Sequence, residues 1–212
     1  MKVLAIESSC DDTSFSIVSG EKSIDFIETI NHRKFHKKHG GVIPEIAARQ
    51  HLDIMGHLQK SIKKIDFKMI DAIAATYGPG LIGGLIVGSS FAKGLSIGKQ
   101  KKLIPINHLQ AHLLSPRLTS NLSFPYLCLL VSGGNTALVL VKSPKKFITL
   151  GSTIDDSAGE CFDKVSKALG LGYPGGPIIE KLALKGDRYK YKLPLPLTKV
   201  KNCNFSFSGL KT

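Results

Sequence analysis

Residues 3–18, VLAIESSCDDTSFSIV, place two short apolar runs on either side of the polar stretch Glu7–Thr13. This pattern predicts two paired strands joined by a polar turn. Residues 126–141, YLCLLVSGGNTALVLV, repeat the pattern around a second polar turn, Ser132–Thr136. We therefore expect an α/β protein of two lobes with the same build, each of which opens with a hairpin.

Further strands and helices are expected after each hairpin. In the first lobe they are a strand at 24–30, a helix from Ile43, a strand at 72–76, a glycine-rich helix at 81–97 and a strand at 103–106. The helix from Ile43 carries apolar residues at three- and four-residue spacing, namely Leu52, Met55, Leu58, Ile62 and Ile65. In the second lobe we expect a strand at 147–150, a helix at 157–169 and another from Pro177.

The boundary between the lobes is predicted in a stretch rich in Ser, Pro, Asn and Thr at 115–125. We therefore assign residues 1–120 to the first lobe and 121–212 to the second. Residues 205–212, FSFSGLKT, predict a strand that turns into a helix and then stops. The second lobe is accordingly expected to be incomplete.

Positive charge dominates the composition. The chain has 29 Lys and Arg against 16 Asp and Glu, a net charge of +13, which attracts polyanions such as nucleic acid. The charge concentrates at 31–64 and at 185–201, each of which is either a solvated face or part of an RNA-binding surface. The absence of Trp argues against a membrane-surface helix. Four dispersed cysteines without a C-x-x-C pair, and no signal or membrane-spanning run, indicate a cytoplasmic protein.

Residues 78–83, GPGLIG, fit the dinucleotide pattern G-x-G-x-x-G between a strand and a helix. The acid that binds the ribose about 20 residues further on is missing, and Pro79 removes an amide. Three interpretations stay open: close packing of a helix on the sheet, a tight loop near a ligand, and a dinucleotide site.

His108 and His112 are four residues apart directly after a strand, so a helix there places both imidazoles on one face. This spacing suits two metal ligands, and the alternative is a pair with a capping or core role. A zinc-protease motif is not supported because Leu109 stands where its general-base Glu would be.

Small and polar residues follow the second hairpin in positions that suit anion binding. Leu130–Thr136 places two glycines and two hydroxyls at a strand end, which suits an oxyanion or phosphate as well as an ordinary turn. Asp163 lies too far along its helix to be a simple N-terminal cap. Residues 173–177, YPGGP, begin a further helix with Glu180 one turn in, where a ligand hydroxyl could donate to its carboxylate.

These motifs together resemble those of the tRNA N6-adenosine threonylcarbamoyltransferase family, formerly labelled glycoproteases. The resemblance rests on ordered segments along the whole chain: IESSCDDT at 6–13, HGGVIPE at 39–45, Asn107–His112, Leu130–Thr136, Asp155–Lys164, YPGGP at 173–177 and FSFSGLKT at 205–212. It implies two ribonuclease-H-like lobes of the actin and sugar-kinase type.

The resemblance also implies an activity and its site residues. The family is an acyltransferase family that moves a threonylcarbamoyl group from threonylcarbamoyl-adenylate to the exocyclic amine of the adenosine 3′ of the anticodon, in tRNAs reading codons that start with A. His108 and His112 would bind one divalent metal, iron first and zinc second, and the third ligand would lie beyond this chain. The adenylate would be held by Leu130, Val131, Ser132, Gly133, Gly134, Asp163, Gly176 and Glu180.

Partners are implied as well: tRNA, a paralogous subunit that dimerises with this chain, and a small ATPase of the same pathway. The alternative function is an actin-like, nucleotide-binding assembly subunit without transfer activity. Metal binding at His108 and His112 together with RNA affinity would favour the transferase, and nucleotide binding without metal would favour the assembly subunit.

Overall fold

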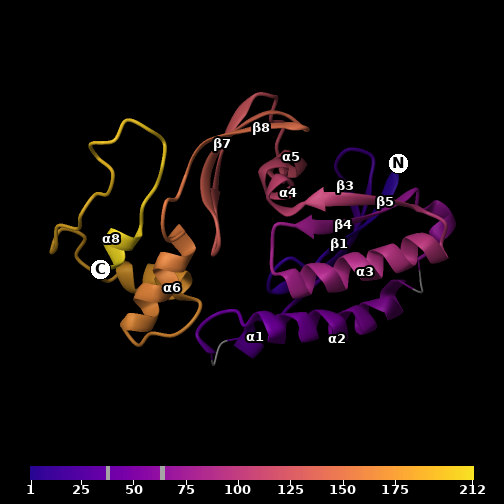
Figure 1. The fold of residues 1–212 in the computed structure, drawn as a ribbon, viewed down its shortest axis with the longest axis horizontal. Helices are drawn as coiled ribbons and strands as arrows, with labels where there is room; N and C mark the ends of the chain where they lie inside the picture. Colours follow the sequence, from indigo (N-terminus) through magenta and orange to yellow (C-terminus); the bar gives the residue numbers. More distant parts are fainter. Residues whose placement is uncertain (37–38, 63–64) are drawn as a thin grey trace. The chain divides into compact units, whose positions relative to one another are not determined.

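The computed structural model describes residues 1–36, 39–62 and 65–212. The chain divides into two compact units, Met1–Ser120 and Asn121–Thr212 (Figure 1). Four lysines of the basic stretch at 31–64 lie outside the described residues: Lys37, Lys38, Lys63 and Lys64.

The first unit is built on a five-stranded sheet. Strands β1 (Lys2–Glu7), β2 (Asp12–Ser19) and β3 (Ser23–Asn31) form an antiparallel meander, and β4 (Ala72–Gly78) and β5 (Lys102–Asn107) continue it in parallel with β1. The strand order is β3-β2-β1-β4-β5. The predicted hairpin is therefore confirmed, and Glu7 pairs with Ser14 at its closed end.

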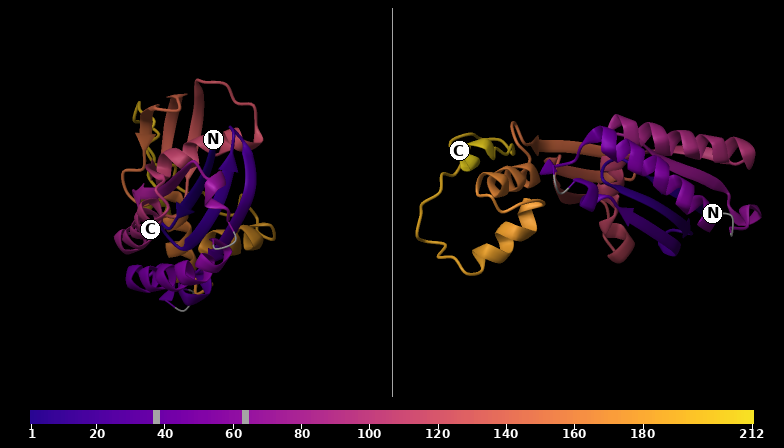
Figure 2. Two further views of the ribbon diagram at one scale, coloured as in Figure 1. Left: turned by 90° about the vertical axis from the view of Figure 1, so that its right-hand side faces the viewer. Right: turned by 90° about the horizontal axis from the view of Figure 1, so that it is seen from below.

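Two long helices, α2 (Pro44–Ile62) and α3 (Ile82–Gly98), lie side by side against one face of this sheet (Figures 1 and 2). The shorter helices α4 (His108–Leu114) and α5 (Pro116–Thr119) lie on its other side, and α1 (Arg33–His36) and the 3-10 turn η2 (Phe67–Met69) are in connections. Ile6, Phe15, Met55 and Ile73 meet in the core beneath α2 and α3. Leu52, one of the apolar residues at helical spacing in α2, is 64% exposed.

The glycines that follow β4 bring α3 close to the rest of the unit. A Cβ on Gly84 would overlap the Ser8 carbonyl, and one on Gly83 would lie 2.8 Å from Cβ of Ala48 on α2. A Cβ on Gly80 would lie 2.6 Å from the Ser9 carbonyl oxygen. These contacts support the close-packing interpretation of the glycine pattern, because only glycine fits such separations.

The second unit repeats the opening meander. Strands β6 (Tyr126–Val131), β7 (Thr136–Ser143) and β8 (Lys146–Ser152) pair antiparallel in the order β6-β7-β8, matching β1-β2-β3. Helices α6 (Ala158–Ala168) and α7 (Gly175–Ala183) follow, and the short α8 (Ser208–Lys211) lies near the end of the chain. Among the described residues no strand pairs with the free edge of β6, the position that β4 occupies beside β1.

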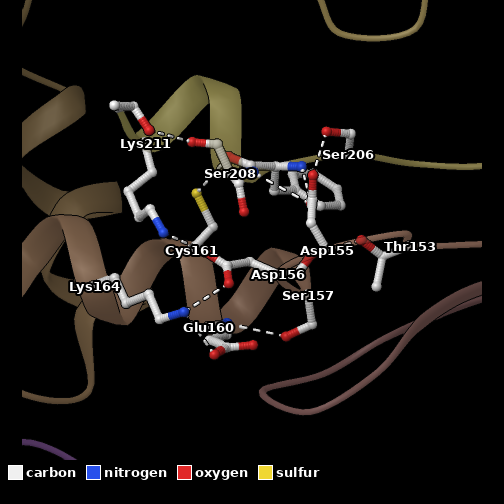
Figure 3. Close-up of polar contacts among 12 residues, drawn as sticks. Thr153, Asp155, Asp156, Ser157, Glu160, Cys161, Lys164, Ser206, Ser208 and Lys211 are labelled. Carbon is white, nitrogen blue, oxygen red and sulfur yellow. Dashed lines mark hydrogen bonds and ion pairs between the residues drawn. The ribbon is translucent and has the colours of Figure 1, made fainter.

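The end of the chain is fastened to the start of α6 by two neighbouring carboxylates (Figure 3). Asp155 accepts hydrogen bonds from the Phe207 amide at 2.8 Å and from the hydroxyl of Ser206. Asp156 pairs with Lys164 at 2.6 Å and Lys211 at 2.8 Å, and these two hydrogen-bonded cations lower its pKa to about 2. The predicted strand at 205–212 is reduced to a single parallel bridge between Phe205 and Thr153.

No helix in the described ranges is long and apolar enough to cross a membrane. All four cysteines are free thiols.

Candidate functional site

The histidine pair lies at the carboxyl end of the first unit's parallel strands. Asn107 ends β5 and caps α4 by accepting a hydrogen bond from the Gln110 amide at 3.0 Å. The helix then places His108 and His112 on one face, with ring centroids 4.5 Å apart and rings nearly perpendicular at 82°. The sequence prediction of a shared face is therefore confirmed.

Glu7, the last residue of β1, and Ser9, in the turn that follows, both contact the His108 ring. The Oε2 atom of Glu7 lies 3.4 Å from Nδ1 of His108, and the Ser9 hydroxyl lies 3.0 Å from the same nitrogen and 3.3 Å from Nε2. Burial would raise the pKa of Glu7, but hydrogen bonds from His108 and Ser9 outweigh burial and lower the pKa, so the carboxylate stays ionised. Histidine ligands of metals commonly donate their second ring N–H to such a carboxylate.

These residues fit a metal ion in part. The pKa of His112 is lowered by desolvation and then by its neighbour His108, which favours the neutral imidazole that metal binding requires. Within the described part of the chain, however, no group of three His, Cys, Asp or Glu side chains is arranged to hold a metal. The structure thus provides two candidate ligands and a supporting carboxylate, and the role of His108 and His112 as ligands stays a prediction.

On the other side of the same turn lies a hydrogen-bonded network of buried histidines, which sequence reasoning did not identify. His51 lies with Nε2 3.1 Å from the Cys10 carbonyl, which can only accept, so Nδ1 carries the lone pair and accepts from the Thr13 hydroxyl at 2.7 Å. Thr13 in turn accepts from Nε2 of His32 at 2.9 Å. The Cys10 carbonyl therefore determines the tautomers of both His51 and His32.

His36, the last residue of α1, is a third buried histidine and contacts the loop before α2. Its Nδ1 accepts from the Ile43 amide at 3.3 Å, so Nε2 carries the proton. His36 Nε2 and His32 Nδ1 are the two buried side-chain polar atoms without a hydrogen-bond partner among the described residues, and one is a donor and the other an acceptor. All three histidines and Thr13 are fully buried. The hydrogen bond between His32 and Thr13 therefore connects the segment after β3 to the turn that contacts His108.

In the second unit, the Ser132–Asn135 turn lies against the start of α6. The Ser132 hydroxyl accepts hydrogen bonds from the Asn135 amide at 3.0 Å and the Gly134 amide at 3.3 Å. The Ser157 hydroxyl, which caps α6, donates to the Gly133 carbonyl at 2.7 Å. A Cβ on Gly159 would lie 2.7 Å from the Ser132 carbonyl oxygen, so turn and helix are in direct contact.

Asp163 connects α6 to the next helix. Its Oδ1 accepts from the Gly175 amide at 2.7 Å and so caps α7, which accounts for a carboxylate this far along α6. A Cβ on Gly133, Gly134 or Gly176 would meet no atom within 4 Å, whereas Gly175 is tightly packed. The three glycines predicted to bind a ligand therefore face open space.

The remaining predicted binding residues differ in exposure. Leu130 is half-buried at the end of β6, while Val131 and Glu180 are exposed. The structure brings the Ser132–Asn135 turn, α6 and the start of α7 into one connected surface, with Glu180 one turn into α7. Binding by these residues stays a prediction.

A cavity of about 180 Å³ in the first unit is lined by Ala111, by apolar sheet residues and by four polar ones, Glu7, Ser14, Ser16 and Thr76. Ligand sites for molecules of nucleotide size run from roughly 300 Å³ upward. This cavity is therefore too small for an adenylate.

Comparison with known proteins identifies close relatives. The family model for TsaD, tRNA N6-adenosine threonylcarbamoyltransferase, matches residues 26–212. The tRNA N6-adenosine threonylcarbamoyltransferase of Orientia tsutsugamushi (strain Boryong) is 53% identical over 215 residues, and that of Wolbachia pipientis wMel is 50% identical over 213 residues. These alignments cover 100% and 99% of this chain but only 62% and 63% of the relatives, which are longer.

Among solved structures, a ROK family protein from Streptococcus pneumoniae TIGR4, determined in complex with sucrose, superimposes with a TM-score of 0.54. The match covers 88% of this chain and 68% of that chain at 15% sequence identity, so it bears on the fold alone. The fold predicted from the sequence, of the actin and sugar-kinase type, is confirmed.

Proposed function

This chain belongs to the tRNA N6-adenosine threonylcarbamoyltransferase family, and from that membership we propose that it transfers a threonylcarbamoyl group to tRNA. The donor is threonylcarbamoyl-adenylate, and the acceptor is the exocyclic amine of the adenosine 3′ of the anticodon in tRNAs reading codons that start with A. The observation that carries the proposal is 53% identity over the whole of the chain to a relative of this name. Because the chain spans 62% of that relative's length, transfer by residues 1–212 is what the experiment must test.

The transfer is a substitution at a carbonyl carbon. The amine nitrogen of adenosine forms the new C–N bond, the bond between the carbonyl carbon and the phosphate oxygen breaks, and AMP leaves with its phosphate as an anion while the amine loses a proton. No covalent bond to the protein is needed. The chain's task is therefore to hold the phosphate, orient the carbonyl and stabilise developing negative charge.

The second unit supplies groups for the adenylate. We assign the phosphate to the open side of the Ser132–Gly134 turn, where no side chain covers the backbone of the two glycines and an anion can approach it closely. Gly176 leaves room beside α7 for the nucleoside, and Glu180 can accept a hydrogen bond from a ribose hydroxyl. The open space at Gly133, Gly134 and Gly176 and the exposure of Glu180 support these roles.

The first unit supplies two histidines for a divalent metal, which when bound would polarise the carbamoyl carbonyl as a Lewis acid. His108 and His112 would hold it, and the metal we expect first is iron, then zinc. Glu7 accepts the Nδ1 proton of His108 and so leaves Nε2 with the lone pair. Ser9 limits the rotation of the same ring.

A protein partner with a similar fold is part of the proposal. The exposed side of α3 carries Ile82 at 72%, Ile86 at 56% and Ile97 at 69% exposure, an apolar row of the kind that marks protein contacts. We propose that a paralogous subunit covers it and that a small ATPase completes the assembly.

The test is nucleoside mass spectrometry of tRNA from cells in which the gene is depleted and then restored as residues 1–212, either unaltered or as His112→Ala. We expect threonylcarbamoyladenosine to be lost on depletion. The unaltered 1–212 chain should restore it, and the His112→Ala variant should not. Unchanged levels of the modified nucleoside in depleted cells that have no second copy would refute the proposal. Nucleotide binding by the purified chain together with failed rescue would favour the assembly-subunit function instead.

A further inference from the structure

The loop between α7 and the fastened end of the chain, Lys185–Lys201, combines exposed aromatic rings with a high density of positive charge. It carries six Lys or Arg against one acid, Asp187. Every residue from Lys181 through Leu195 is exposed, and Tyr189 and Tyr191 show 80% and 73% of their surfaces. Rings of this size normally bury most of their area, so two of them together in solvent indicate a surface that contacts something else.

Cations and rings alternate along the loop. The guanidinium carbon of Arg188 lies 4.8 Å from the ring centroid of Tyr189, and Nζ of Lys190 lies 5.6 Å from that of Tyr191. Each tyrosine thus offers a π surface for stacking next to a charge that can reach a phosphate. Proteins that hold single-stranded nucleic acid without strict sequence preference use this combination of stacking rings and backbone-tracking cations.

Both ends of the loop are attached to ordered parts of the second unit. Its first turn is ordered by Asp187, which accepts from the Tyr189 amide at 2.9 Å, so the one acid of the loop serves its local structure. Pro194 and Pro196 fix their own φ angles and favour an extended path. Beyond the loop, the Asp155 contacts attach the chain to the start of α6 (Figure 3). The bridge between Thr153 and Phe205 attaches it a second time. The rings are therefore carried by a segment with two fixed attachments.

We propose that Lys185–Lys201 is a platform for single-stranded RNA, on which unpaired nucleotides of the tRNA substrate stack against Tyr189 and Tyr191 while the loop cations contact their phosphates. That the RNA is tRNA rests on the proposed function. Charge favours RNA over a protein partner, because five of the six cations are lysines, a residue depleted from protein interfaces. A duplex, whose bases are already stacked, gains nothing from the two rings.

The experiment measures fluorescence anisotropy of the 1–212 chain with two RNA probes. One is a hairpin carrying the anticodon loop of a tRNA that reads codons starting with A, and the other is a fully paired duplex of similar length. Changing Tyr189→Ala and Tyr191→Ala together is expected to weaken hairpin binding by about tenfold per ring and to leave duplex binding nearly unchanged. The pair Tyr189→Phe and Tyr191→Phe keeps both rings and should bind like the unaltered chain.

Charge is tested by salt dependence. Replacing Lys190 and Lys192 by Gln should reduce the slope of log affinity against log salt by about 0.7 for each phosphate contact removed. The matched control is Lys145→Gln with Lys146→Gln, two exposed lysines in the β7–β8 turn of the same unit. Equal losses from the loop pair and the control pair would overturn the platform, because they would show that net charge alone binds RNA.

Transfer is measured on the same proteins with whole tRNA, which separates the two proposals. Hairpin binding that depends on both rings, without any transfer, would support the platform and count against the proposed activity. Transfer with hairpin affinity unaffected by the alanine pair would overturn the platform alone. Unaffected RNA affinity with loss of a bound protein subunit would show that the loop is a protein contact and would equally overturn it.

Discussion

Acidification should destabilise the first unit, because its buried histidines resist protonation in the folded state. The size of this effect can be worked out for His32. Burial lowers the pKa of His32 to about 4, helped by the neighbouring His51 and His36 and opposed by Asp11. Its Nε2 proton is already donated to Thr13, and its Nδ1 has no partner among the described residues to accept from it. A second proton would therefore create a buried charge whose new N–H has no hydrogen-bond acceptor among the described residues.

The direction of the pH effect on stability follows from the protonation of His32 in the folded and the unfolded protein. In the unfolded chain a histidine titrates near 6.5, so between pH 6.5 and about 4 the unfolded state binds a proton that native His32 refuses. The stabilisation is therefore complete above pH 6.5 and is lost as the pH falls toward 4. A difference of about 2.5 units corresponds to roughly 3 kcal/mol, or about 1.4 kcal/mol per pH unit across that window. His36 and His51, whose pKa values burial also lowers, act in the same direction.

The test compares the unaltered chain with His32→Gln in urea titrations at several pH values, followed by NMR. The variant loses hydrogen bonding at neutral pH and should start less stable, but its stability should fall less steeply with acid, by about 1.4 kcal/mol per pH unit. The imidazole resonances of the unaltered chain report the pKa of His32 directly. Titration of His32 near 6.5 in the folded protein, or equal slopes for the two proteins, would refute the reasoning.

Three further predictions concern other parts of the chain. Glu7→Gln should weaken Zn²⁺ or Co²⁺ binding by roughly 10- to 100-fold while leaving the fold intact, which metal titration and circular dichroism would show. Gly88→Ala should lower the free energy of unfolding by about 1–3 kcal/mol, because its new Cβ would overlap the Ser8 hydroxyl. Gly94→Ala in the same helix places its Cβ in open space and should raise the free energy of unfolding by up to about 1 kcal/mol. Urea titrations measure both changes. Asp155→Ala should speed amide exchange in α8, while Glu160→Ala, which removes an exposed ion pair with Lys164, should not; equal effects would contradict the anchoring role.

Much of the local structure could be predicted from the sequence. Alternating apolar residues around the Glu7–Thr13 turn predict β1 and β2, and the same pattern around Ser132–Thr136 predicts β6 and β7. The four-residue spacing of His108 and His112 predicts the shared helix face that the ring geometry confirms. These features follow from the sequence because strand alternation and helical periodicity depend on neighbours within a few residues.

The spacing of residues along one helix does not tell which of them are buried or what they contact. Leu52 has the spacing of a core residue in α2, yet it is 64% exposed, because the width of the face that a helix buries depends on what packs against it. Asp163 could not be explained along its own helix, because its partner is the Gly175 amide at the start of α7.

The site itself depends on contacts between distant parts of the chain. Glu7 and His108 are separated by 101 residues, and Thr13 meets His32 and His51 across 19 and 38 residues. The sequence determined which residues could carry chemistry and on which local elements they lie. Only the tertiary structure decided which carboxylate supports His108 and which tautomer each buried histidine adopts, because the pairing of β1 with β4 and the packing of α2 on the sheet bring those groups together.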